Sequence, residues 1–299
     1  MRLDYSELQC YKQIEIDSHG KLKFFLEKHS TEEGTWAKLS LQTGEIDFVF
    51  LNGQGQGLFR TRLNEKHPQL EIPPSAWHKI IPVSEPFKAT LEFYCLPHRY
   101  FSKKYGLNAV HTDLLYVYQT YLHSLSDLSI LDLGCGSGRN LLYLAKKGHR
   151  ITGIDHHQHL LERIQEIAKK EALAAVNTLM HDLNQPLTLG QAQYDLVIAT
   201  VSLQFLNEQR IPSLIAELQK STKKDGYHFL VFPIQSERYE MPESFRYLPK
   251  KKELYHVYQD SGWSILEYKE SVGHLRKNDE LGRPPLSGLF GLLLAQKIV

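Results

Sequence analysis

An aspartate and three closely spaced glycines are the residues of this chain best suited to bind a ligand. Asp132 stands two residues before Gly134, and Gly136 and Gly138 follow at every second position. They come after an apolar run, residues 128–133, whose length is typical of a buried parallel strand. A helix is predicted directly after the last glycine. A strand, a glycine-rich turn and a helix N-terminus together present backbone N–H groups to a ligand, so this segment predicts a binding site.

The position of Asp132 bears on which ligand this is. A dinucleotide site prefers glycines in the spacing G-x-G-x-x-G and has no carboxylate facing the pyrophosphate. S-adenosylmethionine instead carries an ammonium and a sulfonium, which an aspartate attracts, and a carboxylate, which a helix N-terminus attracts. The Gly-x-Gly-x-Gly spacing alone is a weak signal because plain turns share it. Together with Asp132, it predicts S-adenosylmethionine as the cofactor.

Two further acids end or follow the next two predicted strands. Asp155 ends the strand predicted over residues 150–155 and lies about 20 residues after the glycines, the spacing at which an acid meets the ribose hydroxyls in a nucleotide-binding unit. Asp182 follows residues 176–180, where its carboxylate can accept a hydrogen bond from the adenine amine while the Leu183 N–H serves a ring nitrogen. A single acid here would most simply be a helix N-cap. Right-handed crossovers put all three strand ends side by side, which favours ligand binding over capping.

The other candidate cofactor-binding residues flank the glycines or these strand ends. They are Tyr105, His111, Cys135, Arg139, Asn140, His156, Thr200 and Val201. Tyr105 and His111 precede the first strand of the predicted sheet, and we expect them to shape a lid over the cofactor.

Composition and charge exclude several classes of protein. The chain has 299 residues, of which 42% are hydrophobic and 23% charged, as in ordinary globular proteins. The formal net charge of +1 implies no general attraction to nucleic acid or to anionic membranes. Residues 199–202 stand where a methyltransferase of nucleic acid would carry an Asn/Asp-Pro-Pro-Tyr motif for a flipped base, and they lack it. The cysteines Cys10, Cys95 and Cys135 are scattered, which argues for reduced thiols and against a structural zinc site.

No segment predicts export or membrane insertion. The first residues lack the apolar core of a signal peptide, and the longest apolar run, residues 289–295, is far shorter than the ~20 residues of a membrane span. We therefore expect a soluble cytoplasmic protein whose partner is neither a membrane nor nucleic acid. The sequence leaves the oligomeric state open, a homodimer included.

Residues 1–97 predict a small all-β domain. Short apolar or alternating runs separated by turn clusters suggest a sandwich or barrel of the cupin-like type. The runs are residues 23–26, 35–41, 46–51, 69–72, 78–83 and 88–94. A metal-binding cupin needs two or three converging histidines and an acid. His29, His67 and His78 are available, but a His-x-His pair is absent, so we interpret them as surface or core-rim residues and predict no metal site.

Residues 98–299 predict a Rossmann-like α/β domain. Strands and helices alternate along it, a pattern typical of a mostly parallel sheet, here of seven strands, with helices on both faces. Ligands bind such sheets at the carboxyl ends of the strands. The predicted strands are residues 128–133, 150–155, 176–180, 194–199, 227–232, 263–268 and 287–295, and the predicted helices are residues 109–121, 140–148, 160–172, 208–222 and 250–260.

The chain also resembles a known family. From Tyr100 onward it is similar to the class I S-adenosylmethionine-dependent methyltransferases, and specifically to the tellurite-resistance methyltransferase family TehB. The matching segments are Tyr100-Phe101-x-x-Lys104-Tyr105 followed by His111, residues 131–140, residues 194–206, Pro212-x-Leu-Ile, Gly226-Tyr227, and Gly273 with the charged stretch after it. Residues 1–97 resemble the cupin-like extension of longer TehB proteins. The resemblance implies methyl transfer from S-adenosylmethionine to a small chalcogen oxyanion, tellurite or selenite, as a contribution to tellurite resistance.

The same resemblance implies that a basic loop near the C-terminus serves the substrate. Arg276, Lys277 and Arg283 would hold the oxyanion by charge-assisted hydrogen bonds. The family carries a His-Arg pair and an Asn-Gly-Asn-Arg run in this loop, and this chain keeps the positive charge but not the histidine. The alternative for these three residues is a solvated basic loop. For the whole chain, two alternatives stay open: a methyltransferase for a small organic thiol or amine, and a non-catalytic module that binds or senses S-adenosylmethionine.

Overall fold

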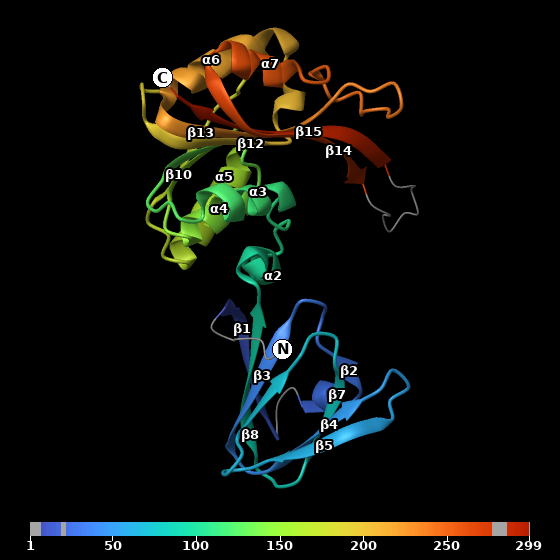
Figure 1. Ribbon diagram of the computed structural model, residues 1–299. Coiled ribbons are helices and arrows are strands. Elements are labelled where there is room, and N and C mark those ends of the chain that lie inside the picture. The colour runs from blue at the N-terminus through green and yellow to red at the C-terminus, as the bar shows by residue number, and fades with distance from the viewer. Residues whose placement is uncertain (1–6, 19–21, 277–285, 299) are drawn as a thin grey trace. The chain divides into compact units, whose positions relative to one another are not determined.

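The computed structural model of the chain describes residues 7–18, 22–276 and 286–298 (Figure 1). It divides into two compact units, Met1–Gly106 and Leu107–Val299. The domain boundary predicted between residues 97 and 98 stays a prediction. Across the described ranges, none of the helices has both the length and the apolar character that crossing a membrane requires.

The first unit consists of two antiparallel sheets with strand orders β1-β8-β3-β6 and β2-β7-β4-β5. Along β3 (Trp36–Thr43), Ala37, Leu39 and Leu41 are buried and alternate with less buried residues, as expected for a strand with one face on a core. The prediction of an all-β N-terminal part is confirmed. The other strands are β1 (Gln9–Asp17), β2 (His29–Ser30), β4 (Ile46–Leu51), β5 (Gly57–Leu63), β6 (Gln69–Ile72), β7 (Trp77–Pro82) and β8 (Lys88–Cys95). The unit ends with η2 (Pro97–Arg99) and α2 (Tyr100–Tyr105).

One strand-like run of the first unit is a helix. Residues 23–26 lie in α1 (Leu22–Leu26), so the strand interpretation of this run is wrong. Phe25 is 6% exposed and Phe24 64% exposed. An apolar run of this length fits one helical turn as well as a buried strand, and its periodicity cannot separate the two. Conversely, the sequence does not predict β1 and β5, because most of their residues are exposed or half-buried and give no apolar run.

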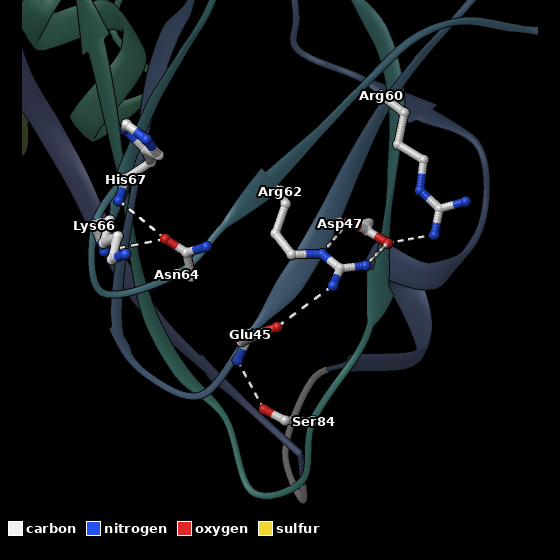
Figure 2. A network of polar contacts seen from close by, with 8 residues as sticks. All are labelled: Glu45, Asp47, Arg60, Arg62, Asn64, Lys66, His67 and Ser84. Atoms are coloured by element: carbon white, nitrogen blue, oxygen red, sulfur yellow. Dashed lines mark hydrogen bonds and ion pairs between the residues drawn. The ribbon is translucent and has the colours of Figure 1, made fainter.

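Strands β4 and β5 are joined by an ion-pair network (Figure 2). The Asp47 side chain is 3% exposed, and both of its oxygens accept hydrogen bonds from Arg62, at 2.8 Å from Nε and 3.1 Å from Nη2. Arg60 forms a further ion pair with the same carboxylate. Hydrogen bonds from these guanidinium groups, that of Arg62 first, hold the pKa of Asp47 below its ordinary value although burial opposes them.

The second unit contains a seven-stranded sheet of order β11-β10-β9-β12-β13-β15-β14, which confirms the predicted fold. Strands β9 to β13 pair in parallel, and β15 is antiparallel to both of its neighbours. Their bounds are β9 (Ser129–Leu133), β10 (Arg150–Asp155), β11 (Val176–Met180), β12 (Tyr194–Thr200), β13 (Thr222–Pro233), β14 (Trp263–Arg276) and β15 (Leu286–Lys297). All residues of β9 except the first are buried, as expected for a central strand covered on both faces.

Helices cover both faces of this sheet. In Figure 1, α6 (Ile211–Ser221) and α7 (Glu253–Asp260) lie on one face, and α3 (Thr112–Val117), α4 (Arg139–Lys146) and α5 (Gln158–Lys170) lie on the other. The shorter helical turns are η3 (Tyr118–Leu122), η4 (Leu203–Phe205) and η5 (Glu208–Arg210). Because strands β9 to β13 run in parallel, the turns that follow them lie at one edge of the sheet, at the carboxyl ends of the strands. The predicted site lies at this edge.

Candidate functional site

The glycine turn between β9 and α4 is fixed by both backbone conformation and packing. Gly134 has φ 65°, and a Cβ atom there would lie 2.5 Å from the Cβ of Ser202. Gly138 has φ 82°, and a Cβ atom there would lie 2.7 Å from Cγ1 of Ile164. Other residues rarely adopt these φ values, and any side chain would clash, so the sequence needs glycine at both positions. The Gly134 N–H donates to the Ile154 carbonyl at 2.8 Å, which fastens the turn to the end of β10.

Asp155, at the end of β10, holds the turn from the other side. Its Oδ2 accepts a hydrogen bond from the Gly136 N–H at 2.9 Å, and its Oδ1 accepts from the His157 N–H at 3.0 Å and from His157 Nδ1 at 2.9 Å. Burial raises the pKa of Asp155, but these hydrogen bonds outweigh it and lower the pKa overall. The carboxylate is therefore charged at neutral pH and stands beside the glycine turn.

Asp132 is a buried carboxylate with an unpaired oxygen. It lies on β9 opposite Gly153 of β10 and Ile198 of β12, and it is 1% exposed. Within the described part of the chain, its Oδ2 has no hydrogen-bond partner. Burial raises the pKa of Asp132 to about 7, although the positive charge of Arg139 opposes the shift. A buried carboxylate in this state can be stabilised by a cationic group of a ligand.

A cavity of about 750 Å³ opens beside the glycine turn. This volume falls in the range of small-molecule sites. The predicted residues that line it are Gly134, Gly136, Asp155, His156, Asp182, Leu183 and Val201. Val201 has φ 53°, which is a rare and costly conformation for a β-branched residue and is most often found at functional sites. Asp182 is exposed and accepts hydrogen bonds from the backbone N–H and the side chain of Asn184, which lower its pKa.

Several predicted residues do not line this cavity. Asn140 Nδ2 donates to Thr200 Oγ1 at 2.8 Å, and its Oδ1 accepts the His111 N–H at 3.1 Å. His111 caps α3, since its Nδ1 accepts the Asp113 N–H. Through the His111 backbone and the side chains of Asn140 and Thr200, these bonds join the start of α3 to α4 and β12 and so position the turn. Asp132, Cys135, Gly138 and Arg139 also lie outside the lining. Tyr105 belongs to the first unit, and its contact with a cofactor stays a prediction.

Residues not predicted as site residues complete the lining. They are His157, Leu160, His181, Asn184, Ser202, Phe205, Leu206, Glu243, Ser244 and Arg246. Arg246 comes from the irregular segment between β13 and α7, and its backbone N–H donates to the Gln204 carbonyl at 2.7 Å. Its Nη1 donates to Asn207 Oδ1 at 3.3 Å. This long-range anchoring brings a guanidinium and the carboxylate of Glu243 to the cavity, and no local pattern in the sequence signals it.

Three side chains at the end of β10 have the ligand types of a metal site. Asp155, His156 and His157 each offer one atom that could bind a metal ion, and these three atoms lie within 4.8 Å of one another. His157 Nδ1 already donates to Asp155 Oδ1, so both atoms are used in the hydrogen bond that orders the turn. The arrangement therefore favours an ordered carboxylate for a ligand hydroxyl over a metal centre.

Comparison with known proteins gives matches along nearly the whole chain. The sequence matches two family models, "Tellurite resistance protein TehB" over residues 93–284 and "TehB-like domain" over residues 22–91. It is 36% identical to the "Probable S-adenosyl-L-methionine-dependent methyltransferase TehB" of Haemophilus influenzae strain 10810, over 98% of this chain and 99% of the relative. The same protein of H. influenzae strain KW20 / Rd is 35% identical over the same shares. The crystal structure of TehB from H. influenzae has a TM-score of 0.89 at 33% identity and covers 98% of this chain and 100% of that chain.

Proposed function

This chain belongs to the TehB family, and we propose that it transfers a methyl group from S-adenosylmethionine to a small chalcogen oxyanion such as tellurite or selenite. The observation that carries the proposal is one cavity that holds the glycine turn, Asp155 and Arg246 together. The first two are suited to the cofactor, and the third is suited to an oxyanion.

The residues present fit S-adenosylmethionine group by group. Its ammonium suits Asp132, whose buried Oδ2 lacks a partner among the described residues, and its carboxylate suits the N-terminus of α4, which no side chain caps. Its ribose hydroxyls suit Asp155 at the end of β10. Its adenine suits the Asp182 carboxylate and the Leu183 N–H, which lie at the same cavity.

The proposed reaction requires the protein mainly to align the oxyanion with the methyl group. When bound, S-adenosylmethionine supplies the methyl group, whose bond to sulfur breaks with the electron pair left on sulfur while a lone pair of the chalcogen forms the new bond. Because the chalcogen has a free lone pair, no residue needs to act as a base. The protein must hold the oxyanion at a near-attack distance of about 3–3.5 Å and exclude water. Phe205 and Leu206, which line the cavity, supply apolar surface for the second task.

Arg246 is our candidate for holding the oxyanion. Its side chain lines the cavity and donates one hydrogen bond within the described ranges, to Asn207, so other guanidinium N–H groups are left to donate. The Glu243 carboxylate at the same cavity would repel an oxyanion, so the guanidinium of Arg246 has to outweigh this repulsion. Lys277 and Arg283 lie outside the described residues, as does the side chain of Arg276. Their predicted role in holding the anion stays a proposal.

The test is cofactor binding followed by product detection. We expect isothermal titration to show binding of S-adenosylmethionine and S-adenosylhomocysteine, and added tellurite to drive formation of S-adenosylhomocysteine from S-adenosylmethionine. Headspace analysis should detect dimethyl telluride when a thiol reductant is also added, because attack by the lone pair formally oxidises tellurium and the volatile product is a reduced form. Arg246→Ala should lower kcat/KM for tellurite by about 10- to 100-fold, the value of a charge-assisted hydrogen bond, and leave cofactor affinity unchanged. Arg238→Ala removes an exposed arginine that stacks on Tyr239 and does not line the cavity, so it serves as the matched control. Cofactor binding without tellurite-dependent formation of S-adenosylhomocysteine would reject the substrate.

A second candidate acceptor is a small organic thiol or amine. Phe205 is 49% exposed in the cavity and packs edge-on against Phe245, with ring centroids 5.4 Å apart. Such an aromatic wall suits an organic body better than a compact oxyanion. Methylation of a thiol probe that is unaffected by Arg246→Ala would favour this candidate.

A further inference from the structure

The first unit encloses a cavity that the proposed methyl transfer does not use. Side chains of both sheets and of α1 line it, and its volume is about 290 Å³, roughly ten times the ~30 Å³ that one water occupies. Most of its lining is apolar. The apolar lining residues are Ile14, Phe24, Phe25, Ala37, Ile72, Leu91 and Phe93, and the polar ones are Lys12, His29, Ser30, Thr31 and His78.

Two histidines face each other across strands at this cavity. His29 of β2 and His78 of β7 are partners in the antiparallel register, and their ring centroids lie 4.2 Å apart. The His78 ring stacks on Phe48 at 4.9 Å, and the His29 ring meets Phe25 edge-on at 5.3 Å. Neighbouring aromatic rings therefore fix the orientation of both imidazoles.

The hydrogen bonds of the two rings define which nitrogen is free. His29 Nδ1 lies 2.9 Å from the Glu27 carbonyl oxygen, and His78 Nδ1 lies 2.8 Å from that of Ala76. A carbonyl only accepts, so each Nδ1 carries the proton. Burial lowers the pKa of both rings, that of His78 to about 4, so each Nε2 is an acceptor at neutral pH.

The acceptor on His29 is unpaired within the described ranges. Its Nε2 is buried and has no hydrogen-bond partner among the residues that the structure describes. Leaving a buried acceptor without a donor is costly. A single water could donate to it, but it would leave most of this cavity, with its apolar lining, unfilled. A ligand with a donor on an apolar body satisfies both features.

We propose that this cavity binds a small aromatic compound that carries a hydroxyl and an anionic group, of the hydroxybenzoate class. The hydroxyl donates to Nε2 of His29, and the ring packs among the apolar lining. The anionic group faces Lys12, which lines the cavity and whose Nζ lies 5.7 Å from the ring centre of Phe93. This site is separate from the cofactor cavity and does not depend on the reaction proposed above.

The test is isothermal titration of the full chain with 4-hydroxybenzoate, benzoate and phenol. We expect 4-hydroxybenzoate to bind most tightly, and benzoate, which lacks the hydroxyl, to bind about tenfold more weakly. His29→Phe keeps an aromatic ring in place and should remove this difference, so that 4-hydroxybenzoate then binds like benzoate. Lys12→Met should weaken both acids but not phenol. His67→Ala, at an exposed position outside the lining, should change nothing.

Two further measurements guard the interpretation. Thermal unfolding of each variant reports whether its first unit is folded, because S-adenosylhomocysteine binding would report on the second unit. Nitrogen NMR of the imidazoles reports the hydrogen bond directly, since the Nε2 signal of His29 should shift with 4-hydroxybenzoate and not with benzoate. Equal affinity for the three probes, an unchanged affinity in His29→Phe, or no binding at millimolar concentration would overturn the proposal. The proposal would also be overturned if zinc chloride, but none of the organic probes, shifted the Nε2 signal of His29, because that result would identify a metal site.

Discussion

At the residue scale, the charge on Asp132 links cofactor binding to pH. Its carboxyl is buried and has an unpaired oxygen among the described residues, and its pKa of about 7 in the free protein lies well above the ordinary 3.8. A bound ammonium favours the charged form and lowers this pKa. Binding must therefore release a proton whenever the pH is below about 7.

We accordingly expect affinity for S-adenosylmethionine to fall as the pH is lowered from 7.5 to 5.5, approaching about tenfold per unit at the acid end. Isothermal titration in buffers of different ionisation enthalpy would measure both the affinity and the proton released. Asp132→Asn should bind about 10- to 100-fold more weakly at pH 7.5 and show a flat pH profile. The control is Asp225→Asn, at a turn position with φ 62° that asparagine tolerates. A sloped profile in Asp132→Asn would mean that another group titrates.

The same carboxyl should affect the stability of the free protein in the opposite sense. Because its folded pKa is raised, the folded state keeps a proton that the unfolded chain releases between pH 3.8 and about 7, so stability is lost as the pH rises through this window. A tenfold difference in proton affinity between the folded and unfolded states corresponds to about 1.4 kcal/mol. We expect Asp132→Asn without cofactor to melt above the wild type at pH 8, with the difference shrinking toward pH 4. Thermal unfolding monitored by circular dichroism would check this, and a lower melting temperature of the variant at pH 8 would contradict it.

At the element scale, the β4–β5 pair depends on one buried acid. Asp47 receives both guanidinium groups of Figure 2, whereas the Glu45 side chain is 44% exposed and lies 3.5 Å from Arg62. Exposed ion pairs contribute little to stability, whereas removing the charge of a buried acid that is paired, such as Asp47 at 3% exposed, is destabilising. The two acids therefore make a matched pair for mutation.

We expect Asp47→Asn to lower the melting temperature of the first unit at pH 7 and Glu45→Gln to leave it nearly unchanged. The pKa of Asp47 is lowered in the folded state, so its contribution is present above the ordinary value of 3.8 and is lost as the pH falls through the lowered pKa. The difference between Asp47→Asn and the wild type should therefore shrink at pH 3. Equal effects of the two substitutions would show that burial of Asp47 does not matter.

The sequence predicted those elements whose burial is continuous or periodic. Strand β9 and most of β10 are buried, and the glycine turn with Asp132 and Asp155 could be located from spacing. Strands β1 and β5 bury too little to give a pattern. Arg246 could not be predicted, because its place at the cavity depends on a hydrogen bond to Gln204, far away in the sequence.

At the scale of the whole molecule, each unit contains a hydrophobic core among its described residues. One core comprises residues of both sheets of the first unit, from Ile16 to Leu91, and the other comprises residues of the second unit, from Leu131 to Ala295. Each core contains only residues of its own unit. The proposed ligands also divide in this way, since each cavity is lined by residues of one unit. Separate cores and separate ligands predict that the units unfold as two cooperative transitions.

We expect calorimetry of the full chain to show two transitions, of which S-adenosylhomocysteine raises only one. At a ligand concentration of 100 times Kd the stabilisation is about 2.7 kcal/mol, enough to raise the midpoint of a transition by several degrees. Asp132→Asn should reduce the rise in midpoint that S-adenosylhomocysteine causes and should leave the second transition unchanged. Asp47→Asn should lower the midpoint of only that second transition, which S-adenosylhomocysteine does not raise. The pair of variants thus assigns each transition to a unit. If S-adenosylhomocysteine and Asp47→Asn acted on the same transition, the two units would unfold together, and their cores would be coupled despite sharing no residue.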